Sequence, residues 1–420
     1  MTDWIDKLGI GLGIIASALF FFVLAVFLYR FFTGAEHRDR LRRLSARAGH
    51  TNWRQVLLLV GTAFLVSRLL MLVGGLFLAA REGTLAYYLN RLEPNWTRWD
   101  ADHYVGLIRN WYVNEGDPRY HIVFFPLYPA IGRLLHLATG LSATACAYIV
   151  SNLAFFGCGV VMYRLAELSY GAKVGARATL LLMFSPLTLF CSIPYTESVF
   201  LLVTLLAVYF ARRRMFALAI LFGALSANAR MLGMATAVPI FYEMLRASKG
   251  SFVRRYGLSI LKVLPVSLGL LAYLYLNYAV TGDPLKFMTY QSEHWGQNFG
   301  SLYNTVLYSL RNAVTFEQVS YRIGTWTPQL IAIFTTLGIL IASARRLRPG
   351  DAGYAAIYFY AAIAPTWLLS GPRYLTALYA VYPALALAFR SRFAYWTLLM
   401  LFAAFCMVAG ALYSYKGWIL

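Results

Sequence analysis

Long apolar segments recur along the whole chain, and they limit its fold more than any other feature. A helix needs about 20 apolar residues to cross the roughly 30 Å hydrocarbon layer of a bilayer, and somewhat fewer where the bilayer thins. Such segments predict an all-α polytopic membrane protein, a bundle of about 12 transmembrane helices. The predicted spans lie near residues 9–32, 55–79, 142–163, 176–194, 197–211, 215–228, 230–246, 257–281, 325–343, 352–370, 374–389 and 393–413.

The charge composition also indicates that lipid surrounds most of this chain. Only 13% of the 420 residues are charged, about half the share that is usual in soluble domains. The net charge of +20 would suit a nucleic-acid partner in a soluble protein, but here the basic residues stand in short runs between apolar segments. Because no basic face with interleaved aromatic residues occurs elsewhere, we expect membrane lipids and no nucleic acid as partners.

The basic runs predict how the spans are threaded through the membrane. Loops rich in Lys and Arg stay on the cytoplasmic side. All the basic runs can lie on that side if 121–140 does not span the membrane but forms a re-entrant or surface-lying helix pair. Both termini then face outward, and compact loops favour a bacterial plasma membrane. The apolar run from Leu8 to Phe32 is too long for a signal peptide, so we expect it to remain as an anchor. The basic runs are 37–54, 164–177, 212–214, 246–255, 345–348 and 390–392.

Two long loops, 81–141 and 282–324, fall on the predicted outer side and are rich in aromatic and charged residues. In the first loop, apolar residues recur every three or four positions, which predicts an amphipathic helix of about three turns lying in the membrane interface. Asp100 stands at its N-terminal end, where a carboxylate is ordinarily a helix cap. The apolar face comprises Tyr104, Leu107, Ile108, Trp111 and Tyr112.

Ionisable residues crowd this outer face in a chain that has only 17 acids. Charged groups at membrane depth are costly and are functional candidates by default, with ion pairing as the structural alternative. For Glu197 that alternative is a pair with Arg230. The candidates on this face are Asp100, Asp102, His103, Glu115, Asp117, His121, Glu197, Asp283, Lys286, Glu293, His294, Arg311 and Arg373.

Other kinds of site have little support in the sequence. The cluster Asp100, Asp102 and His103 has no specific ligand geometry, and the four cysteines lack metal spacing. Glycine-rich phosphate loops are absent as well. We therefore expect no metal and no cofactor.

Chemistry on the outer face requires a donor that is available there. Nucleotide donors are cytoplasmic, so an outward transferase would take its activated group from a lipid-phosphate carrier. Cations would stabilise the charge that develops on the leaving phosphate, and a carboxylate would accept the proton of the attacking hydroxyl. Asp100 is the predicted base, and the candidate cations are Arg373, Lys286, Arg230 and His294.

Several ordered sequence blocks resemble the PIG-V mannosyltransferase family, within the GT-C class of membrane glycosyltransferases. They are WDADHY, FFPLYP, SPLTLFCSIPYTESVF, ANARMLG, GDPLKFMTYQSEHW and SGPRYLTALYAVYP, between Trp99 and Pro383. The resemblance implies an inverting transfer of mannose from a polyprenyl-phosphate donor to a hydroxyl acceptor on the non-cytoplasmic face, without an obligatory metal. It also implies a GT-C-like domain over 51–420, preceded by an additional transmembrane helix and basic cytoplasmic loop at 1–50.

The resemblance also implies roles for particular residues. Asp100 takes the place of the general base, although Asp102 is an additional acid and leaves the choice between the two open. Asp102, if it is not the base, would support the acceptor or the site together with His103, Glu115, Tyr195 and Glu197. The positions that would bind the donor phosphate or sugar are Arg373, Tyr374, Arg230, Lys286 and His294.

Three other functions fit parts of the sequence. A transporter or lipid flippase suits the number of spans, but the charged residues gather on one outer face instead of at the bilayer midplane. A transferase of another group would need an activated nucleophile beside a base, and none is evident. A binding or scaffold subunit would retain the fold without turnover.

Overall fold

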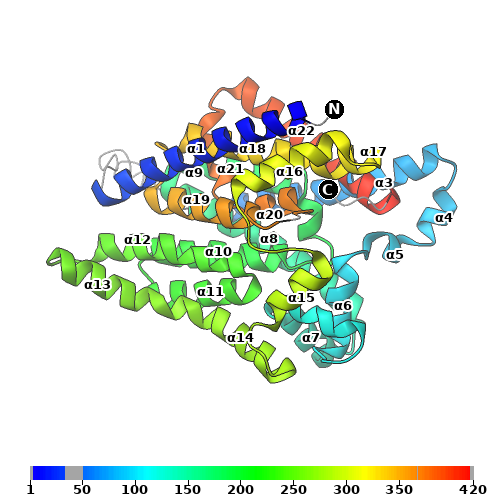
Figure 1. The fold of residues 1–420 in the computed structure, drawn as a ribbon, viewed down its shortest axis with the longest axis horizontal. Coiled ribbons are helices and arrows are strands. Elements are labelled where there is room, and N and C mark those ends of the chain that lie inside the picture. The colour runs from blue at the N-terminus through cyan, green and yellow to red at the C-terminus, as the bar shows by residue number, and fades with distance from the viewer. Residues whose placement is uncertain (1–2, 34–50, 367, 417–420) are drawn as a thin grey trace.

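The computed structural model describes residues 3–33, 51–366 and 368–416, and these ranges form helices joined by loops, without a β-strand (Figure 1). The predicted all-α class is therefore confirmed for this part of the chain. The basic run at 37–54 falls mostly outside the described residues.

Six stretches are long and apolar enough to cross a membrane, and a seventh is added if the bent pair formed by η1 (Asp117–Val123) and α7 (Leu127–Thr139) counts as one span. Large apolar side chains on these helices, such as Leu65 and Phe77, are exposed as they would be toward lipid. The six comprise α1 (Asp3–Thr33), α3 (Trp53–Arg81), α8 (Ala143–Tyr170), α13 (Phe252–Val263) with η4 (Leu264–Ser267) and α14 (Leu268–Thr281), α17 (Val319–Tyr321) with η5 (Arg322–Trp326) and α18 (Thr327–Ser343), and α22 (Arg392–Ala411) with η6 (Leu412–Lys416).

The structure does not confirm twelve spans, because the other predicted segments form shorter helices. The longest of them has 16 residues, or roughly 24 Å at 1.5 Å per residue. Several are apolar because they are buried among other helices, and periodicity alone does not separate this cause from contact with lipid. The shorter helices are α9 (Ala172–Met183), α10 (Glu197–Arg212), α11 (Phe216–Ala229), η3 (Met231–Thr236), α12 (Ala237–Ala247), α19 (Pro349–Ile363), α20 (Gly371–Thr376) and α21 (Val381–Ala388).

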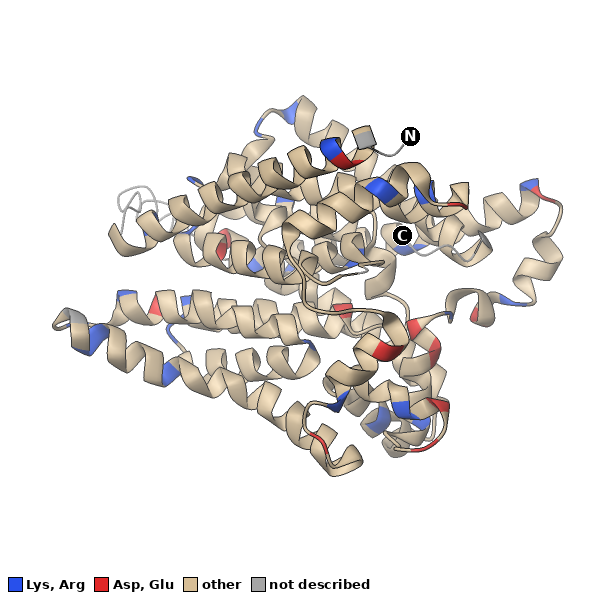
Figure 2. Ribbon diagram, in the orientation of Figure 1, with Lys and Arg blue, Asp and Glu red and all other residues tan. Residues whose placement is uncertain are grey.

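Helix α10 runs through the middle of the molecule and carries a charged residue at each end (Figures 1 and 2). Glu197 begins the helix, and Arg212 ends it. Arg212 forms ion pairs with Asp351 and Glu243, and Glu243 also binds Arg348. Arg212 and Arg348 belong to two of the basic runs, and Glu243 and Asp351 lie on helices next to such runs. The sequence predicted that all the basic runs lie on one side of the membrane. The described runs thus meet at one end of the bundle, and Glu197 lies at the other.

The first predicted outer loop folds into a series of short helices beside the beginning of α10. The bent pair confirms that 121–140 is not a continuous helix, since its two parts meet at 118°. Helix α15 (Lys286–Trp295) of the second loop packs on η1, and α16 (Leu302–Thr315) packs along α1 (Figure 1). The helices of the first loop are α4 (Leu85–Leu89), α5 (Leu92–Trp96), α6 (Asp100–Asn110), η1 and α7.

Two glycines let α3 and α22 approach closely. A Cβ atom on Gly74 would lie 2.3 Å from the carbonyl oxygen of Met407, and one on Gly410 would lie 2.8 Å from the Cα of Met71. Small residues at such crossings are typical of helix packing in membranes. The contact brings η6, which follows α22, against the beginning of the first loop.

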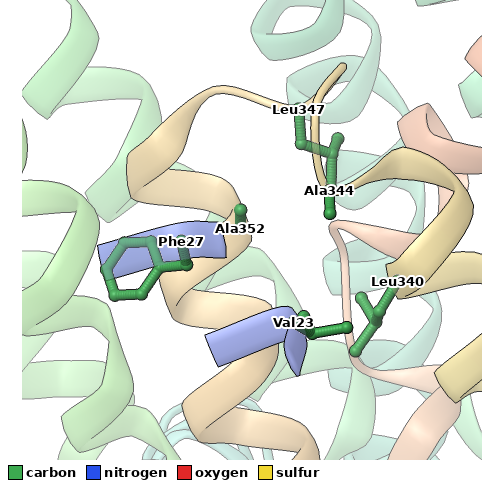
Figure 3. A pocket seen from close by; sticks show the side chains of 6 residues that line it. All are labelled: Val23, Phe27, Leu340, Ala344, Leu347 and Ala352. Atoms are coloured by element: carbon green, nitrogen blue, oxygen red, sulfur yellow. The ribbon is translucent and has the colours of Figure 1, made fainter. Parts of the chain in front are cut away.

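Helix α1 is part of the bundle in spite of its position before the basic run at 37–54. Its Phe20, Val23 and Phe27 are buried in the main apolar core. An apolar gap remains beside it, lined by Val23, Phe27, Leu340, Ala344, Leu347 and Ala352 (Figure 3). This gap contains no polar side chain and is therefore no candidate for the chemistry. The division of the chain at residue 50 stays a prediction.

Candidate active site

Asp100 is the first residue of α6, as the sequence predicted, but its side chain does not cap the helix. The N-cap position belongs to Trp99, and no side chain accepts a hydrogen bond there. The helix buries Tyr104, Leu107 and Ile108 and exposes Asp102, as its periodicity predicted. The reading of Asp100 as an ordinary cap is therefore wrong, because its carboxylate is directed to a partner elsewhere.

That partner is Arg373, which lies 273 positions later in the chain. Its Nη1 donates to Oδ2 of Asp100 at 2.8 Å. Its Nε lies 3.3 Å from Oε1 of Glu197. One guanidinium therefore joins the beginning of α6 to the beginning of α10, and α20 supplies it. Among the described residues, no other side chain or loop forms a hydrogen bond with the Asp100 carboxylate.

Glu197 is paired a second time, with Arg230. The Arg230 Nη1 donates to the same Oε1 at 2.6 Å. Glu197 is 1% exposed, while Asp100 is 25% exposed. The structure thus confirms the ion-pairing interpretation of Glu197. It also shows that, of the two carboxylates, Asp100 is the one that a substrate can reach.

Aromatic rings enclose this charge cluster of Asp100, Arg373, Glu197 and Arg230. The Arg373 guanidinium lies 5.1 Å from the ring centre of Tyr195 and 5.2 Å from that of Tyr374. Arg230 lies 4.7 Å from the ring of Tyr374. Such contacts stabilise a guanidinium that has lost most of its water. Six predicted site residues are therefore brought together.

The two other predicted cations, Lys286 and His294, lie on α15. They belong to a second group of residues, which α6, η1 and α15 supply. The ring of His294 stacks on Tyr120 at 4.5 Å, and the Nζ of Lys286 lies 5.0 Å from the ring of Tyr290. Tyr120 and Tyr290 are themselves in contact, 5.0 Å apart. No described contact joins Lys286 to Arg373 or Arg230. The predicted phosphate-binding set is thus split, and the role of Lys286 and His294 stays a prediction.

His103 links the two groups. It follows Asp100 by three residues, so both side chains lie on one face of α6. Its ring lies 4.7 Å from that of His121 and 5.4 Å from that of Phe124. Burial lowers the pKa of His103, against the opposing influence of Asp100 and Asp102. His103 is therefore neutral at pH 7 and can accept or donate a hydrogen bond beside Asp100.

This protonation state predicts a pH dependence of stability. Below about pH 6.5, the ordinary pKa of a histidine, the unfolded chain binds a proton at His103 that the folded chain does not, so the free energy of unfolding falls as the pH drops. Thermal unfolding of the purified protein between pH 5 and pH 8 should show this loss, and His103→Asn should reduce it. An equal loss in the variant would assign the effect to other groups, such as His121.

Two predicted supporting residues lie apart from the charge cluster. Asp102 is an exposed residue, but nearby protein atoms displace part of the water around its carboxyl group. This desolvation raises the pKa of Asp102, an effect that His103 opposes. Glu115 is exposed in the loop between α6 and η1 and forms no hydrogen bond or ion pair within the described ranges. Neither contacts Arg373. Asp102 therefore lies outside the charge cluster, and the choice of base between Asp100 and Asp102 stays a prediction.

Arg68 is a functional candidate that sequence reasoning missed. It lies midway along α3, and its Nε donates to the hydroxyl of Ser192 at 2.7 Å. Its guanidinium packs on the rings of Phe64 and Phe155. A cation in the centre of an apolar span is itself a signal. By binding Ser192, Arg68 fixes the segment that leads into Tyr195 and Glu197.

In the part of the chain that the structure describes, no three His, Cys, Asp or Glu side chains are grouped so that they could hold a metal ion. Independence from metal stays a prediction.

Comparison with solved structures finds similar chains, among them two of ArnT from Cupriavidus metallidurans. The apo form is 15% identical with a TM-score of 0.47, and the form bound to undecaprenyl phosphate is 16% identical with a TM-score of 0.46. Each comparison covers 76% of this chain and 62% of the ArnT chain, so this chain spans less than two thirds of that protein. No curated protein matches this chain.

A family model provides the stronger comparison. The model for Mannosyltransferase (PIG-V) matches residues 56–292, which is more than half of the chain. Asp100, Glu197, Arg230 and Lys286 lie within the match, whereas the SGPRY block with Arg373 lies beyond it. Arg373 is connected to this region by its contacts with Asp100 and Glu197. On the strength of the family match, the chain belongs to the PIG-V mannosyltransferase family of membrane glycosyltransferases.

Proposed function

We propose that this protein transfers mannose from a polyprenyl-phosphate carrier to a hydroxyl of a lipid-linked or glycan acceptor, on the non-cytoplasmic face of the membrane. Family membership supports the class of reaction. The observation that carries the proposal is the contact of Arg373 with both Asp100 and Glu197. It places a reachable carboxylate next to a buried cation at the end of the bundle opposite the basic runs.

In the proposed reaction Asp100 is the general base. The acceptor oxygen attacks C1 of the mannosyl group, its proton passes to the Asp100 carboxylate, and the bond from C1 to the phosphate oxygen breaks with its electron pair. Attack from the side opposite the phosphate inverts the anomeric centre. Oδ1 of Asp100 would take the proton, since Oδ2 already accepts a hydrogen bond from Arg373. A positioned base of this kind accelerates transfer by about 10²–10⁴.

The leaving polyprenyl phosphate gains negative charge, which the cations of the site would stabilise. Arg373 and Arg230 sit among rings and carboxylates, where a charge interacts more strongly than in water. Tyr374 lies between them and would direct both guanidinium groups toward the donor. Lys286 and His294 would contact the phosphate or sugar from the side of α15.

Transfer by the purified protein tests this function. The protein, in detergent or in lipid nanodiscs, is incubated with polyprenyl-phosphate-mannose and a panel of glycan and lipid-linked acceptors, and the products are separated by mass spectrometry. We expect mannosylated product with an anomeric configuration inverted from that of the donor, as NMR would show. Guanosine-diphosphate mannose serves as the matched control donor and should give no product.

The outcomes also separate the rival functions. Transport of a lipid-linked sugar across proteoliposomes without transfer would support the flippase. Transfer from the nucleotide donor would contradict the proposed lipid-phosphate donor. Retention of the anomeric configuration would contradict direct attack with Asp100 as the base.

A further inference from the structure

The backbone just before Asp100 is strained. Trp99 has φ = 57° and ψ = −130°, in a region that residues with a Cβ atom rarely adopt. Strained backbone of this kind persists only where the surrounding structure holds it, and it is common at functional sites. The start of α6, and with it the Asp100 carboxylate, therefore depends on whatever fixes the peptide on either side of Trp99.

The carbonyl oxygen of Arg98 is that point of attachment. It accepts a hydrogen bond from the amide of Ala101 at 3.1 Å, which closes the first turn of α6. It also accepts from the Tyr413 hydroxyl at 3.1 Å and from the Tyr195 hydroxyl at 3.4 Å. Three donors from three parts of the chain thus converge on one carbonyl directly before the strained residue.

Tyr413 reaches Arg98 because η6 is itself firmly held. Helix η6 is a π-helix, a rare conformation that recurs at functional sites. The hydroxyl of Tyr88 donates to that of Ser414 at 2.9 Å, and both side chains are buried. The ring of Tyr413, which is 1% exposed, packs 6.3 Å from that of Trp96.

We propose that η6 is a positioning element of the active site, and that the Tyr413 hydroxyl, through the Arg98 carbonyl and the strained Trp99, fixes the orientation of Asp100. Tyr413 touches no reacting atom, so it is a positioning residue and not a catalytic one. It lies far beyond the residues of the family match, 56–292. The catalytic part of the proposal rests on the proposed role of Asp100 as the base.

The test compares Tyr413→Phe with Tyr415→Phe. Each variant removes one hydroxyl from η6: that of Tyr413 donates to the Arg98 carbonyl, and that of Tyr415 lies 2.9 Å from the Thr84 hydroxyl. We expect kcat for mannosyl transfer to fall about tenfold in Tyr413→Phe, the equivalent in rate of one lost hydrogen bond, with the donor KM unchanged. Tyr415→Phe should keep the wild-type kcat, and both variants should unfold at similar temperatures. Equal kcat values in the two variants would overturn the positioning role.

A second measurement does not depend on activity. Hydrogen exchange of the Ala101 and Asp102 amides, which bond the carbonyls of Arg98 and Trp99, should accelerate in Tyr413→Phe and not in Tyr415→Phe. Unchanged exchange would overturn the structural contact itself. If exchange accelerates while Asp100→Asn still transfers mannose, the contact stands and the proposed role of Asp100 fails.

Glycine at position 99 provides the third comparison, because glycine adopts positive φ without strain. In a Trp99→Gly background, the Tyr413→Phe change should reduce kcat by a smaller factor than in the wild type. Equal factors in the two backgrounds would show that Tyr413 acts independently of the strain at Trp99.

Discussion

Asp100→Asn is expected to reduce mannosyl transfer at least about 100-fold, the usual scale for the loss of a general base. The substitution retains the size of the side chain, and its amide oxygen can still accept from Arg373. It removes the negative charge and the ability to take a proton. We therefore expect donor binding to persist while the transfer step is lost, which equilibrium binding and single-turnover measurements on the same preparation would separate.

Asp102→Asn is the matched control for this experiment. It makes the same chemical change on the same helix, two positions away, on a side chain that is exposed and does not contact Arg373. Transfer by this variant should remain within a few-fold of the wild type. If transfer persisted in Asp100→Asn and vanished in Asp102→Asn, the assignment of the base would be reversed.

The second large effect is on stability and arises at the other end of α10. Asp351 is 1% exposed and pairs with Arg212, which is 5% exposed. It also accepts hydrogen bonds from the hydroxyls of Tyr170 at 2.8 Å and Tyr379 at 2.7 Å. Asp351→Ala leaves a buried guanidinium without its nearest acid, so we expect a loss of about 3–5 kcal/mol in the free energy of unfolding. Unfolding in detergent, followed by heat or denaturant, would measure it.

Asp6→Ala is a control that breaks an ion pair between the same two residue types in an exposed position. Asp6 accepts from Arg311 at 2.8 Å, and both side chains are partly in solvent. Pairs of this kind contribute about 0–1 kcal/mol. Similar losses in the two variants would mean that burial does not set the cost. A smaller loss of unfolding free energy in Asp351→Ala than in Asp6→Ala would contradict the view that the buried Asp351–Arg212 pair stabilises the fold.

The sequence predicted the class of fold and the helix that carries Asp100 because both depend on local patterns. Apolar periodicity placed Tyr104 and Leu107 inside and Asp102 outside. It did not predict which apolar segments cross the membrane, since a helix such as α10 is equally apolar when other helices surround it. The predicted number of about 12 spans is therefore not confirmed.

Contacts between distant residues account for the rest of the site. The sequence blocks included Arg373 and Glu197, but the contact between them depends on how α18 and α19 position α20. Lys286 and His294 were grouped with Arg373 because all are cations on one face. The fold instead places His294 on Tyr120 of η1 and Lys286 on Tyr290 of α15. Tyr413 carried no signal, because a tyrosine near the end of an apolar helix is common in membrane proteins.

The order in which the charge cluster is completed matters for synthesis at the ribosome. Arg230 follows Glu197 by only 33 residues, whereas Arg373 follows Asp100 by 273. At 5–20 residues per second, the second interval is on the order of 10–60 s. Glu197 thus gains a partner soon after it enters the membrane, while Asp100 waits without its cation until most of the chain has been made. The nascent protein can insert Glu197 together with its partner Arg230, and the charge cluster is completed only after α20 has been made.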